Sequence, residues 1–198
     1  MTAERPLHVT ISLRTTWGAA DKTATLLQRG FLLPITGTVS IAEQLTTLPG
    51  FSEEYISERV QTIFVNGLAE DNTARKLVAG DTLALSAAMP GLAGAIFRRG
   101  GQHSSLRTRP MATKHHSASQ SGHITLKLFN MIATETGPQL LQKGILIKGK
   151  ILARFLDRQG ERMLPLIERV EVDKSAVPPS ELTGIAADNT LVFVTIHS

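Results

Sequence analysis

The chain has 198 residues and a mass of 21.4 kDa, and its hydrophobic content of 42% allows one large domain or two small ones. The absence of cysteine excludes disulfides, thiolate metal sites and a cysteine nucleophile. The net charge of +4 is uneven: it is −2 over residues 1–97, +5 over residues 98–122 and +1 over residues 123–198. A basic middle segment therefore separates two nearly neutral parts.

The first predicted element is a strand over residues 8–13, which read HVTISL, and the same pattern returns at residues 123–128, which read HITLKL. Each segment places three apolar residues on one face and polar residues on the other. After connections of nearly equal length, LLQRGFLL at residues 26–33 matches LLQKGILI at residues 140–147. The paired matches indicate an internal duplication.

A short helix follows in each copy. In the first copy, Ser40 and Glu43 fit a capping box, in which each side chain accepts a hydrogen bond from a free backbone N–H of the first turn. In the second copy, apolar residues within 151–156 form a stripe before Gln159-Gly160 ends the helix. Two strands close each copy, over residues 61–65 and 82–85, and over residues 170–172 and 190–194. The predicted order in both copies is strand, strand, helix, strand, strand.

Two turns in the first copy carry a family resemblance. Asn66-Gly67 follows the third strand, and Gly80-Asp81 opens the last one. With the element order, these turns resemble the small sulfur carriers, which include the small subunit of molybdopterin synthase and the sulfur carrier of thiamine synthesis. The resemblance covers residues 8–91, with a weaker echo over 123–198.

The resemblance implies an α+β fold of two tandem β-grasp (ubiquitin-like) domains, each a mixed sheet covered by one helix. The expected division is a sulfur-carrier-like domain at 1–97, a basic connector rich in serine and histidine at 98–122, and a diverged second domain at 123–198.

A candidate carrier tail follows the first copy. In the sulfur carriers, a flexible C-terminal tail ends in Gly-Gly, and its last carboxylate is adenylated and converted to a thiocarboxylate. The counterpart here is Arg98-Arg99-Gly100-Gly101, which also resembles the tail of ubiquitin but precedes the second copy. The resemblance implies a carrier only if a protease cuts after Gly101. We favour the alternative of a flexible cationic linker in which the glycines permit a turn.

The connector also carries candidate phosphate contacts, Arg107, Arg109 and Lys114. Aromatic residues that could stack on bases are missing from it apart from the flanking Phe97, so nucleic-acid association is an alternative and a solvated linker is preferred. The connector region also contains histidines without helical spacing or an acidic partner, so we expect surface histidines and no metal site. These histidines are His103, His115, His116 and His123.

Catalytic signatures are missing from the sequence. It has no phosphate-binding glycine loop, Ser/His/Asp arrangement or zinc-protease motif, and Glu53, Glu54 and Glu58 have the spacing of a solvated helix face. The longest apolar stretch, 83–97, is too short to span a bilayer and contains Pro90. We therefore expect no catalytic activity, no cofactor and no membrane partner. Because residues 1–6 run straight into the first strand pattern without a charged-then-apolar signal segment, we expect a cytoplasmic location.

The favoured function is a non-catalytic protein-binding module built from duplicated β-grasp domains related to sulfur carriers. Its sheet edges or connector would meet a protein partner, because exposed edges suit strand addition. One alternative is a sulfur-carrier-like protein of molybdopterin or thiamine synthesis, activated by cleavage after Gly101. A second is nucleic-acid association through the basic connector.

Overall fold

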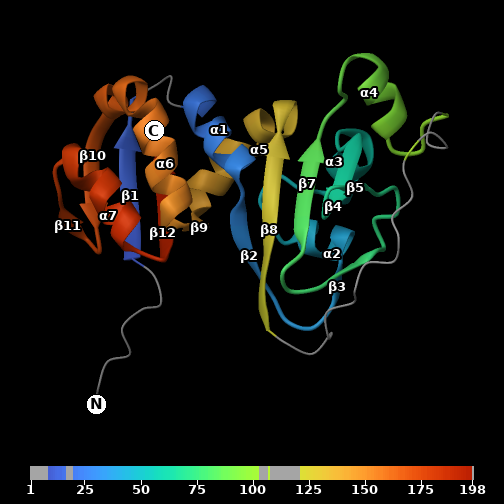
Figure 1. The fold of residues 1–198 in the computed structure, drawn as a ribbon, viewed down its shortest axis with the longest axis horizontal. Helices are drawn as coiled ribbons and strands as arrows, with labels where there is room; N and C mark the ends of the chain where they lie inside the picture. Colours follow the sequence, from blue (N-terminus) through green and yellow to red (C-terminus); the bar gives the residue numbers. More distant parts are fainter. Residues whose placement is uncertain (1–8, 17–19, 103–106, 108–120, 198) are drawn as a thin grey trace. The chain divides into compact units, whose positions relative to one another are not determined.

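The computed structural model describes residues 9–16, 20–102, 107 and 121–197. The fold is mixed α+β, with both parallel and antiparallel strand pairs (Figure 1). By the contacts among its residues, the chain divides into two compact units. Unit 1 contains residues 1–31 and 137–198, and unit 2 contains residues 32–136. Each unit therefore combines segments from both sequence repeats.

Unit 1 is a mixed sheet with helices from both ends of the chain. Its elements are β1 (Val9–Thr15), α1 (Ala20–Arg29), β9 (Ile145–Lys148), α6 (Gly149–Met163), β10 (Ile167–Val172), β11 (Ser175–Ala176), α7 (Leu182–Asp188) and β12 (Leu191–His197). The strand order is β11-β10-β1-β12-β9. Strand β1 pairs antiparallel with β10 and parallel with β12, and Figure 1 shows it as a blue strand among orange and red ones. A strand of the first repeat thus lies inside a sheet made of the second.

The core of unit 1 follows from alternation along β1. Ile11 and Leu13 are fully buried, whereas the intervening Ser12 is only partly covered. The register places Ile11 opposite both Val172 of β10 and Val194 of β12. Helix α6 adds a buried apolar stripe, which contains Leu152, Phe155, Leu156 and Met163.

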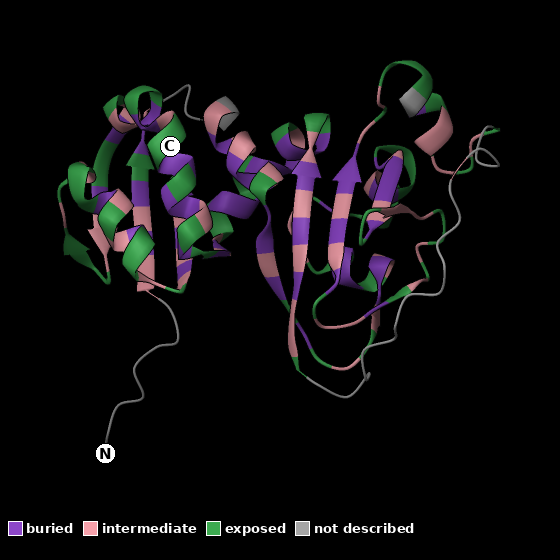
Figure 2. Ribbon diagram, viewed as in Figure 1, coloured by how far each residue is buried: buried purple, intermediate pink, exposed green. Residues whose placement is uncertain are grey.

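Unit 2 has the complementary composition. Its elements are β2 (Phe31–Ile35), β3 (Val39–Ser40), α2 (Ile41–Thr46), α3 (Glu53–Glu58), β4 (Thr62–Val65), β5 (Leu68–Ala69), β6 (Lys76–Leu77), β7 (Thr82–Ser86), α4 (Gly91–Phe97), β8 (Gly122–Phe129) and the start of α5 (Asn130–Lys143). The main strand order is β2-β8-β7-β4-β5, and β3 pairs with β6. Strand β8, from the second repeat, pairs parallel with β7 (yellow beside green in Figure 1). Its residues alternate between buried and partly buried (Figure 2).

Most of the predicted strands are present, and the capping box of α2 is confirmed: Glu43 N–H donates to Ser40 Oγ, and Ser40 N–H donates to the Glu43 carboxylate. The predicted second-repeat helix is the central part of α6, but its predicted end at Gln159-Gly160 is wrong, because α6 continues to Met163. Helices α1 and α5 were not predicted, so the order strand, strand, helix is wrong at this point, because a helix stands between the first two strands of each repeat. The physical reason lies in the matched segments LLQRG and LLQKG, in which Gly30 and Gly144 adopt φ of 99° and 101° and end the preceding helix.

The compact units cut across the predicted limits of 1–97, 98–122 and 123–198. Those limits describe repeats along the sequence, and the division of the sequence into two repeats and a connector stays a prediction. The two divisions differ because β1 and β8 each lie in the unit formed mainly by the other repeat. Within the described ranges, no helix is long and apolar enough to cross a membrane.

Candidate binding groove on unit 2

A row of side chains crosses the three strands β4, β7 and β8 on the sheet face away from the core. The register pairs Phe64 with Ala84, and Ala84 with Lys127. Residues in register on neighbouring strands share a face, so these side chains form one surface. The adjacent row on the same face consists of Thr62, Ser86 and Phe129.

Small residues at the middle of this face leave a hollow. Ala84 and Ser86 stand on the central strand β7, between larger side chains on β4 and β8. The resulting groove has a cavity volume of about 470 Å³, within the usual range for ligand sites. It is lined by Phe64, Gly67, Thr82, Ala84, Leu85, Ser86, Met89, Lys127, Phe129 and Asn130.

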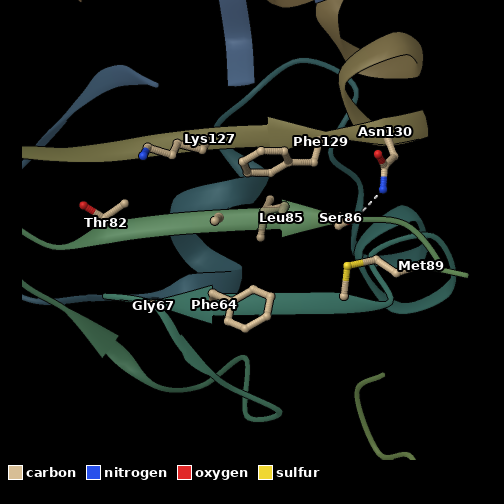
Figure 3. A pocket seen from close by; sticks show the side chains of 10 residues that line it. Phe64, Gly67, Thr82, Leu85, Ser86, Met89, Lys127, Phe129 and Asn130 are labelled. Atoms are coloured by element: carbon tan, nitrogen blue, oxygen red, sulfur yellow. Dashed lines mark hydrogen bonds between the residues drawn. The ribbon is translucent and has the colours of Figure 1, made fainter. Parts of the chain in front are cut away.

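The walls of the groove are largely apolar. Figure 3 shows the rings of Phe64 and Phe129 and the thioether of Met89 around the small residues of β7. The Phe64 ring packs against Phe97 of α4 at a centroid distance of 5.3 Å and an interplanar angle of 57°. This contact fixes one aromatic wall, whereas the unbranched Met89 side chain can adapt to different shapes.

Two polar side chains from β8 and the start of α5 complete the groove. Asn130 has a φ of 51°, a left-handed conformation that asparagine tolerates and that turns the chain sharply from β8 into α5. Its Nδ2 donates to Ser86 Oγ at 2.9 Å (dashed in Figure 3). Lys127 takes part in none of the ion pairs found among the described residues. The groove therefore offers a cation that is not neutralised within that part of the chain.

A polar cluster fixes the start of α5 against α3. Tyr55 Oη donates to Glu135 Oε2 at 2.6 Å, and Arg59 forms an ion pair with the same carboxylate. The hydrogen bond from Arg59 holds the pKa of Glu135 below its usual value, and burial raises the pKa of Tyr55. Because these charges satisfy one another, the cluster has a positioning role: it holds the helix whose first residue, Asn130, lines the groove.

The two family-like turns lie side by side in unit 2. Asn66 and Gly67 form the two-residue turn between β4 and β5, with φ of 52° and 80°. Asn66 Nδ2 donates to Asp81 Oδ1 at 2.7 Å, and Asn66 Oδ1 accepts from the Thr82 N–H at 2.8 Å. Gly80 N–H donates to the His123 carbonyl of β8 at 2.9 Å. The turns thus brace the ends of three strands, and Gly67 also lines the groove.

The candidate carrier tail forms a turn within unit 2. After α4, Gly101 N–H donates to the Arg98 carbonyl at 3.0 Å, with Gly100 at a φ of 64°. Arg99 N–H donates to the Gln61 carbonyl at 2.7 Å. The segment therefore forms a turn with its own backbone partners.

Arg107 holds this turn from the connector. Its Nε donates to the Ile96 carbonyl at 2.8 Å, and its Nη2 donates to the Arg98 carbonyl at 2.6 Å. Its Nη1 pairs with Asp71 at 2.8 Å, and the Arg107 side chain is only 11% exposed. Of the other candidate contacts in the connector, Arg109, Lys114, His103, His115 and His116 lie outside the described residues.

The groove was not predicted from the sequence, although one signal was present. Phe64 and Phe129 are aromatic at positions where strand alternation predicts polar residues. Among the described residues, no group of His, Asp and Glu side chains could hold a metal ion. Comparisons of the chain with protein-family models, with curated proteins and with solved structures each find no match.

Proposed function

We propose that this protein is a non-catalytic binding module built from two β-grasp units related to the sulfur carriers, and that the groove of unit 2 receives an extended segment of a partner protein. That segment carries apolar side chains beside a carboxylate. The mixed sheet and the paired turns at Asn66 and Asp81 support the β-grasp relationship. The observation that carries the binding proposal is the Lys127 cation, which has no ion-pair partner among the described residues, within a largely apolar groove.

The shape of the groove favours an extended peptide. Its lining runs along β7 from Thr82 to Ser86. Four steps at a rise of about 3.3 Å span roughly 13 Å, the length of four residues of an extended chain. A peptide along this path can place alternate side chains between Phe64 and Phe129.

Apolar burial and the ion pair contribute differently to affinity and specificity in this groove. Burial of one large apolar side chain of the partner contributes about 1.5–3 kcal/mol. An exposed pair between Lys127 and a carboxylate contributes only about 0.2–1 kcal/mol. The aromatic and thioether walls therefore supply most of the affinity, and Lys127 selects partners that carry a negative charge.

The test uses synthetic eight-residue peptides that combine leucine or phenylalanine with glutamate. Backbone amide resonances of the full-length protein are followed by NMR during titration. We expect shifts at Phe64, Ala84 and Lys127, and weaker binding of the same peptides with lysine in place of glutamate. If no peptide of the series shifts these resonances, or if the shifts fall on another face, the groove is not the binding surface.

Lys127→Glu isolates the contribution of the cation. We expect at least a threefold loss of affinity for the acidic peptides and a gain of affinity for the lysine-containing peptides, because the substitution replaces the positive charge in the groove by a negative one. Lys174→Glu, which makes the same charge change at an exposed residue of unit 1, is the matched control and should leave both affinities unchanged. Equal effects of the two variants would contradict a local role for Lys127.

The carrier and nucleic-acid hypotheses stay predictions. A carrier would need Gly101 freed from a turn in which the neighbouring Arg98 and Arg99 have backbone partners. Arg107, a candidate phosphate contact, already uses its guanidinium on carbonyls and on Asp71. No contact among the described residues favours either hypothesis over the groove.

A further inference from the structure

Each repeat places its first strand in the unit built mainly from the other repeat. Strand β1 of the first repeat lies in parallel register with β12, which closes the second repeat, over Val9–Arg14. Strand β8 of the second repeat lies in parallel register with β7, which closes the main sheet of the first, over Thr125–Phe129. The exchange is reciprocal: the pairing of β1 with β12 lies within unit 1, and the pairing of β8 with β7 lies within unit 2.

The exchanged segments are central to the packing of the units that receive them. In unit 1, β1 pairs on both edges, with β10 and with β12, and its Ile11 and Leu13 are buried. Backbone contacts extend the pairing beyond the ladder: Asp173 N–H donates to the Thr10 carbonyl at 2.9 Å, and Thr16 N–H donates to the Leu166 carbonyl at 2.8 Å. Loss of β1 would separate β10 from β12 and open the middle of the sheet.

Helix α1 follows β1 in the chain and also packs against segments of the second repeat. Its Leu26 and Leu27 are fully buried, and Leu27 approaches Gly137 so closely that a Cβ there would lie 2.8 Å from Leu27 Cδ1. Lys22 Nζ donates to the Arg162 carbonyl at the end of α6 at 3.1 Å. An N-terminal strand and helix thus act together as one inserted piece.

Unit 2 depends on the opposite half of the chain in the same way. Ile124, Leu126 and Leu128 of β8 are each fully buried. Thr125 N–H donates to the Asp81 carbonyl at 2.8 Å, at the end where the two family-like turns meet. Without β8, the parallel partner of β7 and one side of the core would be missing.

We infer that the two halves of this chain, on either side of the connector, are obligate partners: each half supplies a core strand to the other, so breaking the connector leaves one stable non-covalent complex. The connector links the halves covalently and is not needed to hold them together. The physics is that of strand complementation, in which main-chain pairing and buried alternate side chains hold an inserted strand.

Cleavage after Gly101 would leave the two fragments paired through their exchanged strands. In the fragment 1–101, β1 would stay paired between β10 and β12 of the fragment 102–198, and α1 would keep its contacts with α6 and with Gly137. Arg107 of the second fragment would still donate to the Arg98 carbonyl of the first. Cleavage alone would therefore not release a free carrier domain.

The experiment uses the full chain with a specific protease recognition sequence inserted between residues 118 and 119. After complete cleavage, size-exclusion chromatography with light scattering at micromolar concentration reports the mass in solution. We expect both fragments to co-elute at the mass of the intact chain and to separate only in denaturant. Two separate peaks under native conditions would overturn the inference.

Variants on β1 test whether its insertion holds the fragments together. Leu13→Asp places a charge at a buried position of β1, and we expect at least a tenfold increase in the dissociation constant of the cleaved complex. Arg14→Asp, at the exposed neighbouring position, is the matched control and should leave the complex intact.

Hydrogen exchange of the cleaved wild-type protein measures the pairing of β1 and β8 directly, even if Leu13→Asp does not fold. The amides of β1 and β8 should stay protected after cleavage. Rapid exchange of both strands would contradict the inference, whatever the variants do. Neither result depends on whether the groove binds peptides.

Discussion

At the scale of single residues, the site depends on which side chains are small. Ala84 sits between Phe64 and Lys127 in one row, and a larger residue there would fill the space between them. Lys127 takes its importance from the same arrangement, because its ammonium shares the groove with apolar walls and not with a carboxylate of the described residues. The groove thus depends on one alanine that stands between Phe64 of β4 and Lys127 of β8.

Arg107 gives a second case of a single residue that orders a segment. It donates to the carbonyls of Ile96 and Arg98 and pairs with Asp71. Hydrogen bonds from a charged group are worth about 1.5–3 kcal/mol each, so we expect Arg107→Ala to loosen the turn that follows α4. Trypsin should then cut after Arg98 and Arg99 at least tenfold faster, as measured by mass spectrometry of the digest.

Arg169→Ala is the control for this substitution. It removes an arginine of similar reach whose side chain is 65% exposed in its pair with Glu171. Exposed pairs contribute little, so cleavage after Arg98 should keep its wild-type rate. An unchanged rate in Arg107→Ala as well would show that the turn is held by its backbone contacts alone.

At the scale of elements, helix α2 shows how a sequence pattern becomes a pH-dependent interaction. The hydrogen bond from Ser40 N–H, helped by Lys76, lowers the pKa of Glu43 from 4.5 to about 2. A depressed carboxyl pKa stabilises the fold above the unfolded value and loses that contribution as the pH falls from 4.5 towards 2. Acid should therefore weaken the start of α2.

Glu43→Gln tests this expectation. The amide keeps an acceptor for the Ser40 N–H but does not titrate, so the variant should lose less stability than the wild type between pH 4.5 and pH 2. Denaturant midpoints across that range measure the difference.

Ser40→Ala should cost about 1 kcal/mol at neutral pH, because it removes the other half of the box. A Glu43 carboxyl that titrates in NMR at its usual value would contradict the argument.

Elements marked by a short chemical pattern could be predicted from the sequence. Helices that run directly into a strand could not, because one apolar segment contains both the end of the helix and the start of the strand. The capping box at Ser40 and the turn at Asn66-Gly67 are chemical patterns that allow few alternatives, and both are present. Helices α1 and α5 were missed because their last turn runs directly into a strand. Gly30 and Gly144 mark that boundary, since each adopts the positive φ that ends a helix.

At the scale of the whole molecule, the strand exchange could not be predicted because the two repeats are alike in sequence. The first strands of the two copies, HVTISL and HITLKL, present the same alternation of apolar and polar residues. Either strand therefore satisfies the pattern of either sheet, and local sequence does not specify which closing strand it joins. The groove was hidden for the same reason, because Lys127 joins Ala84 and Phe64 only through the exchanged strand β8.

The exchange predicts crossed effects of matched core substitutions. Ile11 of β1 and Leu126 of β8 are both fully buried, and replacement of either by alanine should cost about 2–5 kcal/mol. Ile11→Ala lies in the first repeat but should reduce the protection of β10 and β12, which belong to the second. Leu126→Ala lies in the second repeat but should reduce the protection of β7 and β4, which belong to the first.

Native-state hydrogen exchange resolves the two variants strand by strand. If each repeat folded on its own first strand, the pattern would reverse: Ile11→Ala would open β4 and β7, and Leu126→Ala would open β10 and β12. The crossed and uncrossed outcomes differ in which amides lose protection, and not only in how much stability is lost. The pair of variants therefore distinguishes an exchanged molecule from two independent repeats even if both substitutions destabilise the protein equally.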